Sequence, residues 1–257
     1  MRRHAYLVCI LLMAALCAAQ TQPSAPAQSS YHPVAEIHIT SPKPGMTAQY
    51  EQARKTHMAW HRTQKDPWSW QTWEIVTGPN TGGYVTGTFG HRWTEFEARE
   101  KFNATDRADA ERTMAPTTAM AEMNYAILRT DLSRNPENST MPRMAAVTHF
   151  WVNAADVPAF TEAIKRINAG ITKIQYPAKP SRWYQVMSGE GPHFVMVSDR
   201  ASWADMEPLD RTIDEAMAQA YGEQEGPALM MSLRKGVKRM STELIVHRPD
   251  LSYVAAK

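Results

Sequence analysis

The stretch WQTWEIVTG at residues 70–78 continues into YVTGTF at 84–89 and WTEFE at 93–97, and this succession returns as RWYQVMSG at 182–189, FVMVSD at 194–199 and WADME at 203–207. Trp93 and Trp203 lie 110 residues apart, as do Tyr84 and Phe194. This period exceeds the ~20–50 residues of solenoid repeats and has the size of a domain. We therefore interpret the body of the chain as a tandem duplication, whose two copies could pair and build one site between them.

The residue patterns predict the same order of elements in both copies. In the first copy, residues 34–40 alternate as a strand does, a helix follows at 46–63, and two strands flank the glycine-rich turn at 78–83. A helical region over 93–123 and a closing strand at 124–132 complete it, and the second copy repeats the order with strands opening at 146 and closing at 243–247. A β-α-β-β-α-β unit is ferredoxin-like and covers one face of its antiparallel sheet with helices. We expect an α+β fold in which the two units close into one α/β barrel.

The chain ends and the joint between the copies have their own composition. Arg2 and Arg3 precede an apolar run at 7–16 and small residues at 17–19, a pattern typical of a signal peptide at 1–19. We expect a flexible tether at 20–32, a first barrel half at 33–134, a linker at 135–143 and a second half at 144–257. The apolar run is shorter than the ~20 residues that span a bilayer. The sequence thus predicts a periplasmic or secreted protein with no transmembrane segment after cleavage, the alternative being an uncleaved anchor.

Cysteine usage and charge exclude several kinds of site. Cys9 and Cys17, the two cysteines, both fall in the predicted signal peptide, so the mature chain would have no disulfide, zinc-thiolate site or cysteine nucleophile. Without Arg2 and Arg3 the 28 basic residues become 26 and equal the 26 acidic ones. A neutral chain lacks the phosphate-neutralising surface of nucleic-acid-binding proteins. We expect no nucleic-acid partner.

Several of these motifs resemble one superfamily. Pro44-Gly45 opens an amphipathic helix, a Trp-x-x-Trp strand precedes a glycine-rich hairpin, and Trp-x-x-Phe/Met-Glu follows the third strand of each copy. In these features the chain is similar to the dimeric α/β-barrel superfamily, and within it to NIPSNAP-like and antibiotic-biosynthesis-monooxygenase-like domains, over residues 34–132 and 145–251. The resemblance implies the fold. It implies no single reaction, because members include cofactor-free oxygenases, haem enzymes, isomerases and dehydratases.

The candidate catalytic residues lie on the two opening strands. His38 and His149 are 111 residues apart, and Glu36 is in phase with His38. Because strand side chains alternate, we expect Glu36 and His38 to point into the lumen while Ile37 and Ile39 pack under the helices. There the histidines could act as general bases, hydrogen-bond a substrate or hold a metal or haem. The alternative is that they only line a polar cavity.

Three aromatic residues are the candidate ligand-binding residues. Trp73 aligns with Tyr184 in the second copy, and Trp151 is in phase with His149. A lumen lined by such rings suits a small hydrophobic or aromatic molecule.

The sequence predicts neither a metal site nor a cofactor. His57 and His61 have a metal-binding spacing of four on the first helix, but no Glu follows His57 as in the zinc-protease helix, so we expect a solvated or half-buried helix face. Motifs for dinucleotides, nucleoside triphosphates and serine hydrolases are absent. Haem would need a proximal ligand such as His149 or His193.

These expectations combine into one functional hypothesis and two alternatives. We expect an exported barrel that binds a small hydrophobic or aromatic molecule and acts on it by cofactor-independent oxidation or proton transfer. The first alternative is a non-catalytic periplasmic binding or stress-associated protein, and the second is a haem-binding protein. Since one chain carries both halves, it would be a monomeric pseudo-dimer or a higher homo-oligomer.

Overall fold

The computed structural model describes residues 34–134 and 142–256 of the 257-residue chain. The predicted signal peptide at 1–19, the tether at 20–32 and most of the linker at 135–143 lie outside these residues. Within them, no helix combines the length and the apolar character needed to cross a bilayer.

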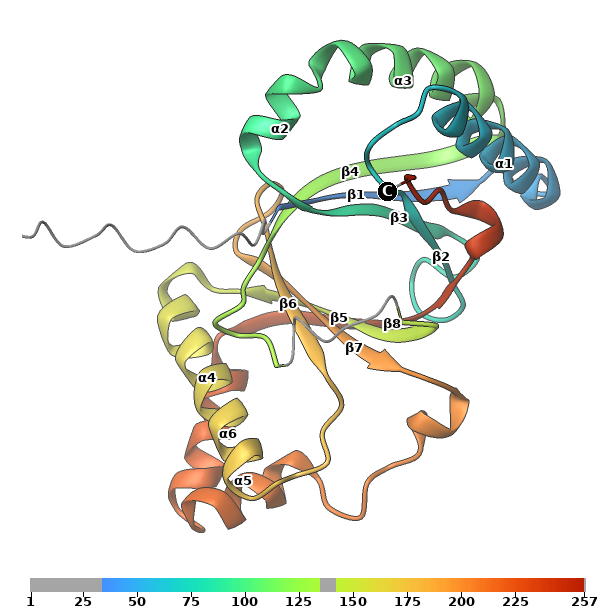
Figure 1. Cartoon of the computed structure of the whole chain (residues 1–257). Coiled ribbons are helices and arrows are strands. Elements are labelled where there is room, and N and C mark those ends of the chain that lie inside the picture. Colours follow the sequence, from blue (N-terminus) through green and yellow to red (C-terminus); the bar gives the residue numbers. More distant parts are fainter. Residues whose placement is uncertain (1–33, 135–141, 257) are drawn as a thin grey trace, which may run out of the picture. The chain divides into compact units, whose positions relative to one another are not determined.

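Each half of the described chain has the same order of elements (Figure 1). The first half contains β1 (Val34–Pro42), α1 (Thr47–Thr63), β2 (Gln71–Ile75), β3 (Tyr84–His91), α2 (Trp93–Ala98), α3 (Glu100–Thr113) and β4 (Thr118–Leu128). The second half contains β5 (Met144–Val152), α4 (Val157–Lys173), β6 (Ser181–Val186), β7 (His193–Arg200), α5 (Ile213–Tyr221), α6 (Glu225–Lys235) and β8 (Val237–His247). Short 3-10 turns, η1 (Ala115–Thr117), η2 (Ala154–Asp156), η3 (Trp203–Met206) and η4 (Pro249–Leu251), complete the described elements.

The strands form one antiparallel sheet whose order closes on itself. The order is β1-β3-β2-β8-β5-β7-β6-β4, and β4 returns to pair with β1. In the first half β1 pairs with β3 and β4, and β2 pairs with β3. In the second half β5 pairs with β7 and β8, and β6 pairs with β7. The pairs β2·β8 and β4·β6 join one half to the other. The expected α+β fold with an antiparallel sheet is confirmed.

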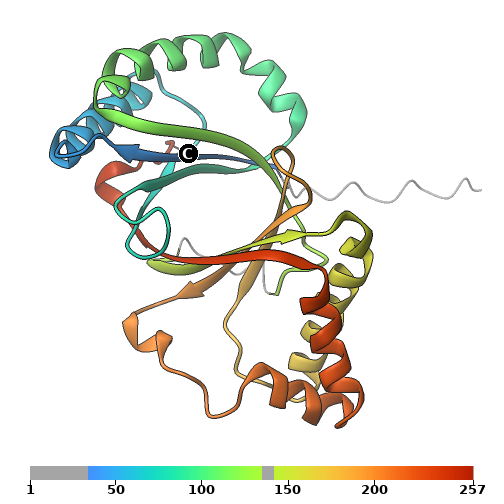
Figure 2. The same ribbon diagram turned by 180° about the vertical axis from the view of Figure 1, so that it is seen from behind.

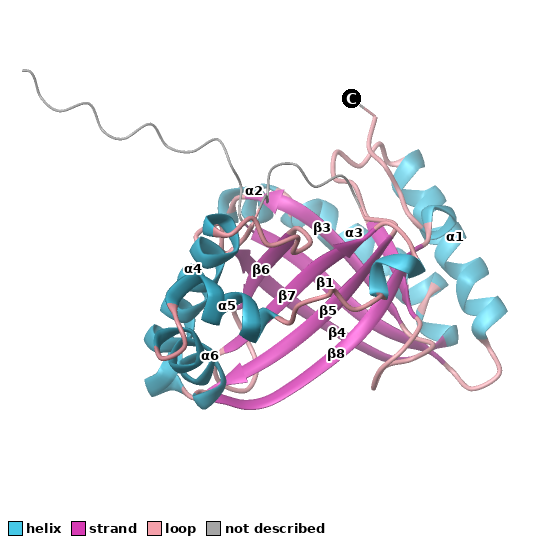
Figure 3. Cartoon of the chain, turned by 90° about the horizontal axis from the view of Figure 1, so that it is seen from below, coloured by secondary structure: helices cyan, strands magenta, loops and turns pink. Residues whose placement is uncertain are grey.

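The helices lie on the outer face of the sheet in two groups (Figures 1 and 2). Helices α1 to α3 cover the outer face of the first half's strands, and α4 to α6 cover the outer face of the second half's strands at the opposite side of the molecule (Figure 3). Apolar residues fill the space between α4 and its strands, among them Phe150, Phe160 and Trp183. A separate apolar cluster lies on the inner face, with Trp73, Val147 and Ile245 among its members.

The predicted orientation of β1 is wrong. Ile37 and Ile39 face the lumen, whereas Glu36 and His38 face the helices. The pairing registers give the reason: His38 pairs with Thr86 of β3, and the residue 110 positions after Thr86, Met196, pairs with Thr148. The counterpart of His38 is therefore Thr148 and not His149. An alignment shifted by one residue moves every side chain to the opposite face of a strand.

The closing strands β4 and β8 begin about six residues earlier than predicted, at Thr118 and Val237. The Ala- and Met-rich composition of residues 118–123 predicts a helix, but these residues pair along β1 from Pro42 to His38. Their side chains are mostly exposed, so the alternation that marks a strand is missing. Backbone pairing has overridden the local helix propensity.

The segments that follow β4 and β8 pack into the opposite halves. After β4, the fully buried Leu132 joins the apolar cluster of Phe150 and Phe160 in the second half. After β8, Leu251 packs against Tyr50 and Tyr84 of the first half. Tyr253 continues this crossing, since its backbone exchanges two hydrogen bonds of 2.8 Å with Trp70. Each half is thus completed by a short tail from the other.

Candidate functional site

The lumen contains a cavity of about 400 Å³, lined by side chains of β1 to β8. Aromatic rings of Trp73, Phe89 and Tyr184 and aliphatic residues such as Val195 form most of its wall. Gly87 leaves space for this packing, because a Cβ there would lie 2.7 Å from the Phe89 ring. The polar groups on the wall are few and include His149, His193, Arg182, Glu122, Asn124 and Glu243.

His149 and His193 form a half-buried imidazole pair on the neighbouring strands β5 and β7. Nδ1 of His149 lies 3.0 Å from Nε2 of His193, and the rings stack with centroids 5.2 Å apart. Burial lowers the pKa of His149 to about 4, helped by the His193 and Arg239 charges, and burial with Arg239 lowers the pKa of His193 to about 4. Both rings are therefore neutral near pH 7, and the pair can accept a proton from a bound molecule.

Glu243 adds an acidic group to the same cavity. Its side chain is only 3% exposed, and Asn80 Nδ2 donates a 2.6 Å hydrogen bond to its Oε1. Burial raises the pKa of this carboxyl above its usual value. The turn that carries Asn80 approaches closely because Gly78 has φ +94° and a Cβ there would lie 2.8 Å from Glu243 Cγ.

The imidazole and the carboxyl occupy diagonal positions of one strand pair. His149 is opposite Ser241 of β8, and Glu243 is opposite Val147 of β5. Diagonal residues on one face of an antiparallel pair lie about 7–8 Å apart, a distance that a small molecule can bridge. The lumen thus brings a proton acceptor and a carboxyl that resists ionisation to one cavity.

The structure separates the residues that the sequence grouped together. His149, Trp73 and Tyr184 line the lumen cavity, but Glu36 and His38 do not, because they lie on the other face of β1. Trp151 is not on the cavity wall either. It stacks on His193 with centroids 4.4 Å apart, and the Arg239 guanidinium lies 3.5 Å from its ring centroid. Trp151 thus packs against both rings of the imidazole pair without lining the cavity.

Three residues of the site, Glu243, Asn80 and Arg239, are not among those that the sequence patterns single out. A signal for Glu243 existed, since it alternates with Ile245 and both face the lumen. No pattern could indicate Asn80 or Arg239, because each reaches the site from a turn or a strand end whose position depends on the folded sheet.

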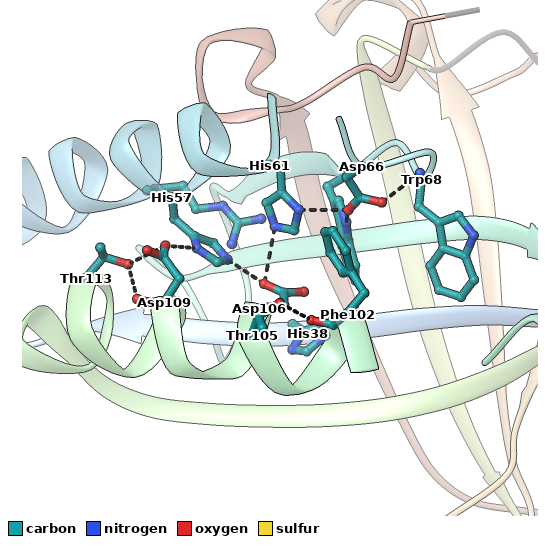
Figure 4. A network of polar contacts seen from close by, with 12 residues as sticks. His38, His57, His61, Asp66, Trp68, Phe102, Thr105, Asp106, Asp109 and Thr113 are labelled. Carbon is teal, nitrogen blue, oxygen red and sulfur yellow. Dashed lines mark hydrogen bonds and ion pairs between the residues drawn. The ribbon is translucent and has the colours of Figure 1, made fainter. Parts of the chain in front are cut away.

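Glu36 and His38 lie in a second pocket, of about 510 Å³, between β1, β4 and the helices α1 and α3. His38 Nε2 and Glu36 Oε1 are 2.7 Å apart, so the two side chains are hydrogen-bonded to each other outside the lumen. The same pocket holds His57 and His61, and the prediction of a solvated or half-buried helix face is wrong for both. They are 5% and 1% exposed: Asp109 of α3 bonds to His57, and Asp66, five residues along the chain, bonds to His61 (Figure 4).

A third pocket, of about 650 Å³, lies under α4 to α6 in the second half. Its wall is largely apolar and includes Phe150, Ile164 and Trp183. Among the described residues that line it there is no histidine. The two haem-ligand candidates, His149 and His193, face the lumen instead, where their ring nitrogens bond to each other. This arrangement does not favour the haem interpretation.

Comparison with known proteins identifies the fold alone. The chain is similar to a candidate monooxygenase from Lactobacillus acidophilus NCFM (TM-score 0.50, 11% identity, 88% of this chain and 97% of that chain covered). It is also similar to a candidate monooxygenase from Fusobacterium nucleatum (TM-score 0.53, 9% identity, 87% and 98% covered). A chlorite dismutase variant from Candidatus Nitrospira defluvii has a TM-score of 0.51 at 10% identity, with 84% and 92% covered. No protein-family model matches the sequence, and no curated protein does.

Proposed function

We propose that this protein is an exported enzyme that binds a small hydrophobic or aromatic molecule in the barrel lumen and removes a proton from it. The observation that carries the proposal is the half-buried His149–His193 pair, which lines the same aromatic-walled cavity as the buried Glu243. A general base must be unprotonated at the working pH, and this pair meets that condition, while its pKa of about 4 restricts it to substrates with an unusually acidic proton. The oxygenase-like neighbours support the same class of chemistry by fold analogy only.

The chemistry suits a substrate whose proton becomes acidic next to an aromatic ring. His149 takes the proton, and Arg182 on the cavity wall, held by Asp199 at 2.5 Å, offers guanidinium N–H groups as hydrogen-bond donors to the resulting anion. Such an anion can reduce O₂ without a cofactor. A CH₂ group then becomes a carbonyl group, and the second oxygen atom leaves as water, so that substrate and O₂ balance.

The proposal includes the tandem duplication and the export. Constant register offsets support duplication: the pairs of β1 with β3 recur 110 residues later in β5 with β7. The pairing of His38 with Met123 recurs as Thr148 with Thr242, which sets β8 119 residues after β4. The basic, apolar and small residues of 1–19 support export to the periplasm or the medium.

The test separates catalysis from binding. Native mass spectrometry first identifies what the lumen retains, and oxygen uptake is then measured with tricyclic aromatic ketones that carry an acidic CH₂ group. We expect His149→Asn to bind such a compound within a few-fold of the parent and to lower kcat at least ~100-fold, the usual effect of losing a general base. His38→Asn is the matched control, since it changes a histidine on the outer face of the barrel.

Two results would contradict the catalytic proposal. A His149→Asn variant that turns over as fast as the parent excludes His149 as the base. Binding without any turnover by the parent favours the second candidate, a non-catalytic binding protein, for which the same apolar cavity is the supporting observation.

A further inference from the structure

Two histidine rings and one carboxylate converge beneath α1 and α3, outside the lumen. His57 and His61 are four residues apart on α1, so their rings lie on one face of the helix. Asp106 of α3 faces both: its Oδ1 is 3.3 Å from His57 Nε2 and 3.4 Å from His61 Nε2. One ligand atom from each residue lies within 4.8 Å of the other two (Figure 4). We propose that these three residues bind one divalent transition-metal ion.

The spacing is that of ligands around an ion. Hydrogen bonds between N–H and O mostly measure ~2.7–3.2 Å, so 3.3 and 3.4 Å are long for direct bonds. Two atoms that each lie about 2.1 Å from a metal, at a tetrahedral angle, are about 3.4 Å apart. Asp106 Oδ1 already has this separation from Nε2 of each ring, and the ligand atoms of all three residues lie within 4.8 Å of one another.

The opposite nitrogen of each ring determines where its lone pair points. His57 Nδ1 is 2.8 Å from Asp109 Oδ2, and His61 Nδ1 is 2.7 Å from Asp66 Oδ2. A carboxylate only accepts hydrogen bonds, so Nδ1 carries the proton in both rings. Nε2 of each ring therefore faces the Asp106 carboxylate and is the nitrogen left to bind a cation. Two imidazole nitrogens and a carboxylate oxygen that point at one another are held together by a cation, which is a metal ion in our proposal and a proton on Nε2 in the alternative that the test below distinguishes.

The supporting aspartates are themselves held in place. Arg99 donates two hydrogen bonds to Asp66, at 2.5 and 2.6 Å, and Trp70 Nε1 donates a third at 3.1 Å. Arg112 pairs with Asp109. Carboxylates that orient metal-bound histidines through Nδ1 are the usual second layer of a protein metal site, and they fix the tautomer and the ring angle.

The site has an open side toward the 510 Å³ pocket. Three protein ligands leave at least one coordination position for water or a substrate. Arg54, 8% exposed, lines the same pocket, and its buried Nε has no hydrogen-bond partner among the described residues. A buried guanidinium of this kind favours an anionic oxygen ligand beside the ion.

The ligand types narrow the choice of metal. Two imidazoles and one carboxylate with open positions suit Fe²⁺, Co²⁺ or Zn²⁺, whereas Mg²⁺ and Ca²⁺ prefer sites made only of oxygen ligands. The corresponding pocket of the second half is largely apolar. The proposed metal site thus belongs to the first half and is independent of the proposed lumen chemistry.

Cobalt provides a direct test, because bound Co²⁺ absorbs visible light and its band intensities depend on the coordination number. The untagged, chelator-treated protein is titrated with Co²⁺ and then with Zn²⁺ as a competitor. We expect one equivalent of Co²⁺ to bind and Zn²⁺ to displace it. Asp106→Asn should weaken Co²⁺ binding at least ~100-fold, more than the ~10–100-fold effect of losing a second-layer partner, which we expect for Asp109→Asn.

The control is Glu100→Gln, which removes the same charge from an exposed position on α3 and should change the affinity less than ~3-fold. The absence of Co²⁺ bands in the folded parent protein would overturn the proposal, whatever the variants do. An equal loss of Co²⁺ affinity in Glu100→Gln and Asp106→Asn would also overturn it. So would ¹⁵N NMR spectra of the Co²⁺-free protein with one equivalent of Zn²⁺ in which the Nε2 atoms of His57 and His61 both still carry protons. If Asp106→Asn fails to fold, His57→Gln serves as the second ligand variant. The oxygen uptake attributed to the lumen does not involve these residues, so both variants should match the parent in that assay.

Discussion

At the residue scale, protonation distinguishes the lumen from the outer pocket. Among residues 34–134 and 142–256 no carboxylate hydrogen-bonds to His149 or His193, and their bond to each other requires one ring to donate and the other to accept. Arg239 lies close enough to lower the pKa of both. By contrast, each buried imidazole of the outer pocket has an aspartate at Nδ1. The protein therefore keeps His149 and His193 neutral in the lumen, whereas aspartates orient His57 and His61 in the outer pocket.

The first prediction concerns this neutral pair. In ¹⁵N NMR spectra both rings should remain neutral from pH 8 to pH 5, because their pKa values are about 4. An unfolded histidine titrates near ~6.5, so the unfolded state binds the proton first as the pH falls. The contribution of the pair to stability is thus complete above pH ~6.5 and is lost progressively toward pH ~4. Arg239→Gln should raise both pKa values. Titration midpoints at ~6.5 for His149 and His193 in the parent would contradict their lowered pKa values.

The sequence revealed single residues of the sites but not their partners. The spacing of His57 and His61 was visible on α1, yet Asp66, Asp106 and Asp109 approach from other segments. Without these aspartates the two histidines resemble a solvated face. Strand alternation correctly places His149 in the lumen. The same argument puts Glu36 and His38 on the wrong face of β1, because it aligns His38 with His149 and not with Thr148, one residue out of register.

At the scale of elements, propensity predicted the kinds of segment and pairing determined their ends. The order strand, helix, strand, strand, helix, strand was readable in both halves from periodicity and glycine-rich turns. The ends of β4 and β8 were not, because their first residues are exposed and are held by pairing with β1 and β5. The long helical region of the second half is also broken, at Gly222 with φ +91°, into α5 and α6.

The close crossing of α5 and α6 gives the second prediction. A Cβ on Gly226 would lie 2.5 Å from the backbone of Met217 and Ala218, and backbone atoms cannot yield as a flexible side chain can. Gly226→Ala should therefore destabilise the protein by about 1–3 kcal/mol, although alanine favours helices. Urea unfolding measures this. Ala228→Ser, exposed on the same helix, should stay within ~0.5 kcal/mol, and equal stability of Gly226→Ala would show that the helices can move apart.

At the scale of the whole molecule, the closed strand order determines whether any edge of the sheet needs a second chain to pair with. Every described strand has two neighbours within the chain, so no sheet edge remains to be covered by a second copy. The expectation that the two halves close on each other came from the repeat of Trp93 and Trp203 and of the strands before them. The sequence could not show which faces would meet.

The third prediction follows from this closure. Sedimentation equilibrium at micromolar concentration should give the mass of one chain, at most 29.0 kDa. A stable dimer that dissociates only on unfolding would show that a further surface needs covering. Salt-dependent weak association would leave the closure of the sheet within one chain intact.

The exchanged tails affect the order in which the protein can assemble. Residues 249–253 leave the ribosome after every helix and strand of both halves, yet Leu251 completes the core around Tyr50 and Tyr84, and Tyr253 donates a 2.7 Å hydrogen bond to the carbonyl of Asp66, the residue that orients His61. The first half therefore cannot mature during synthesis while the second is still being made. Its aspartate and histidine cluster is finished last, although its residues are made first.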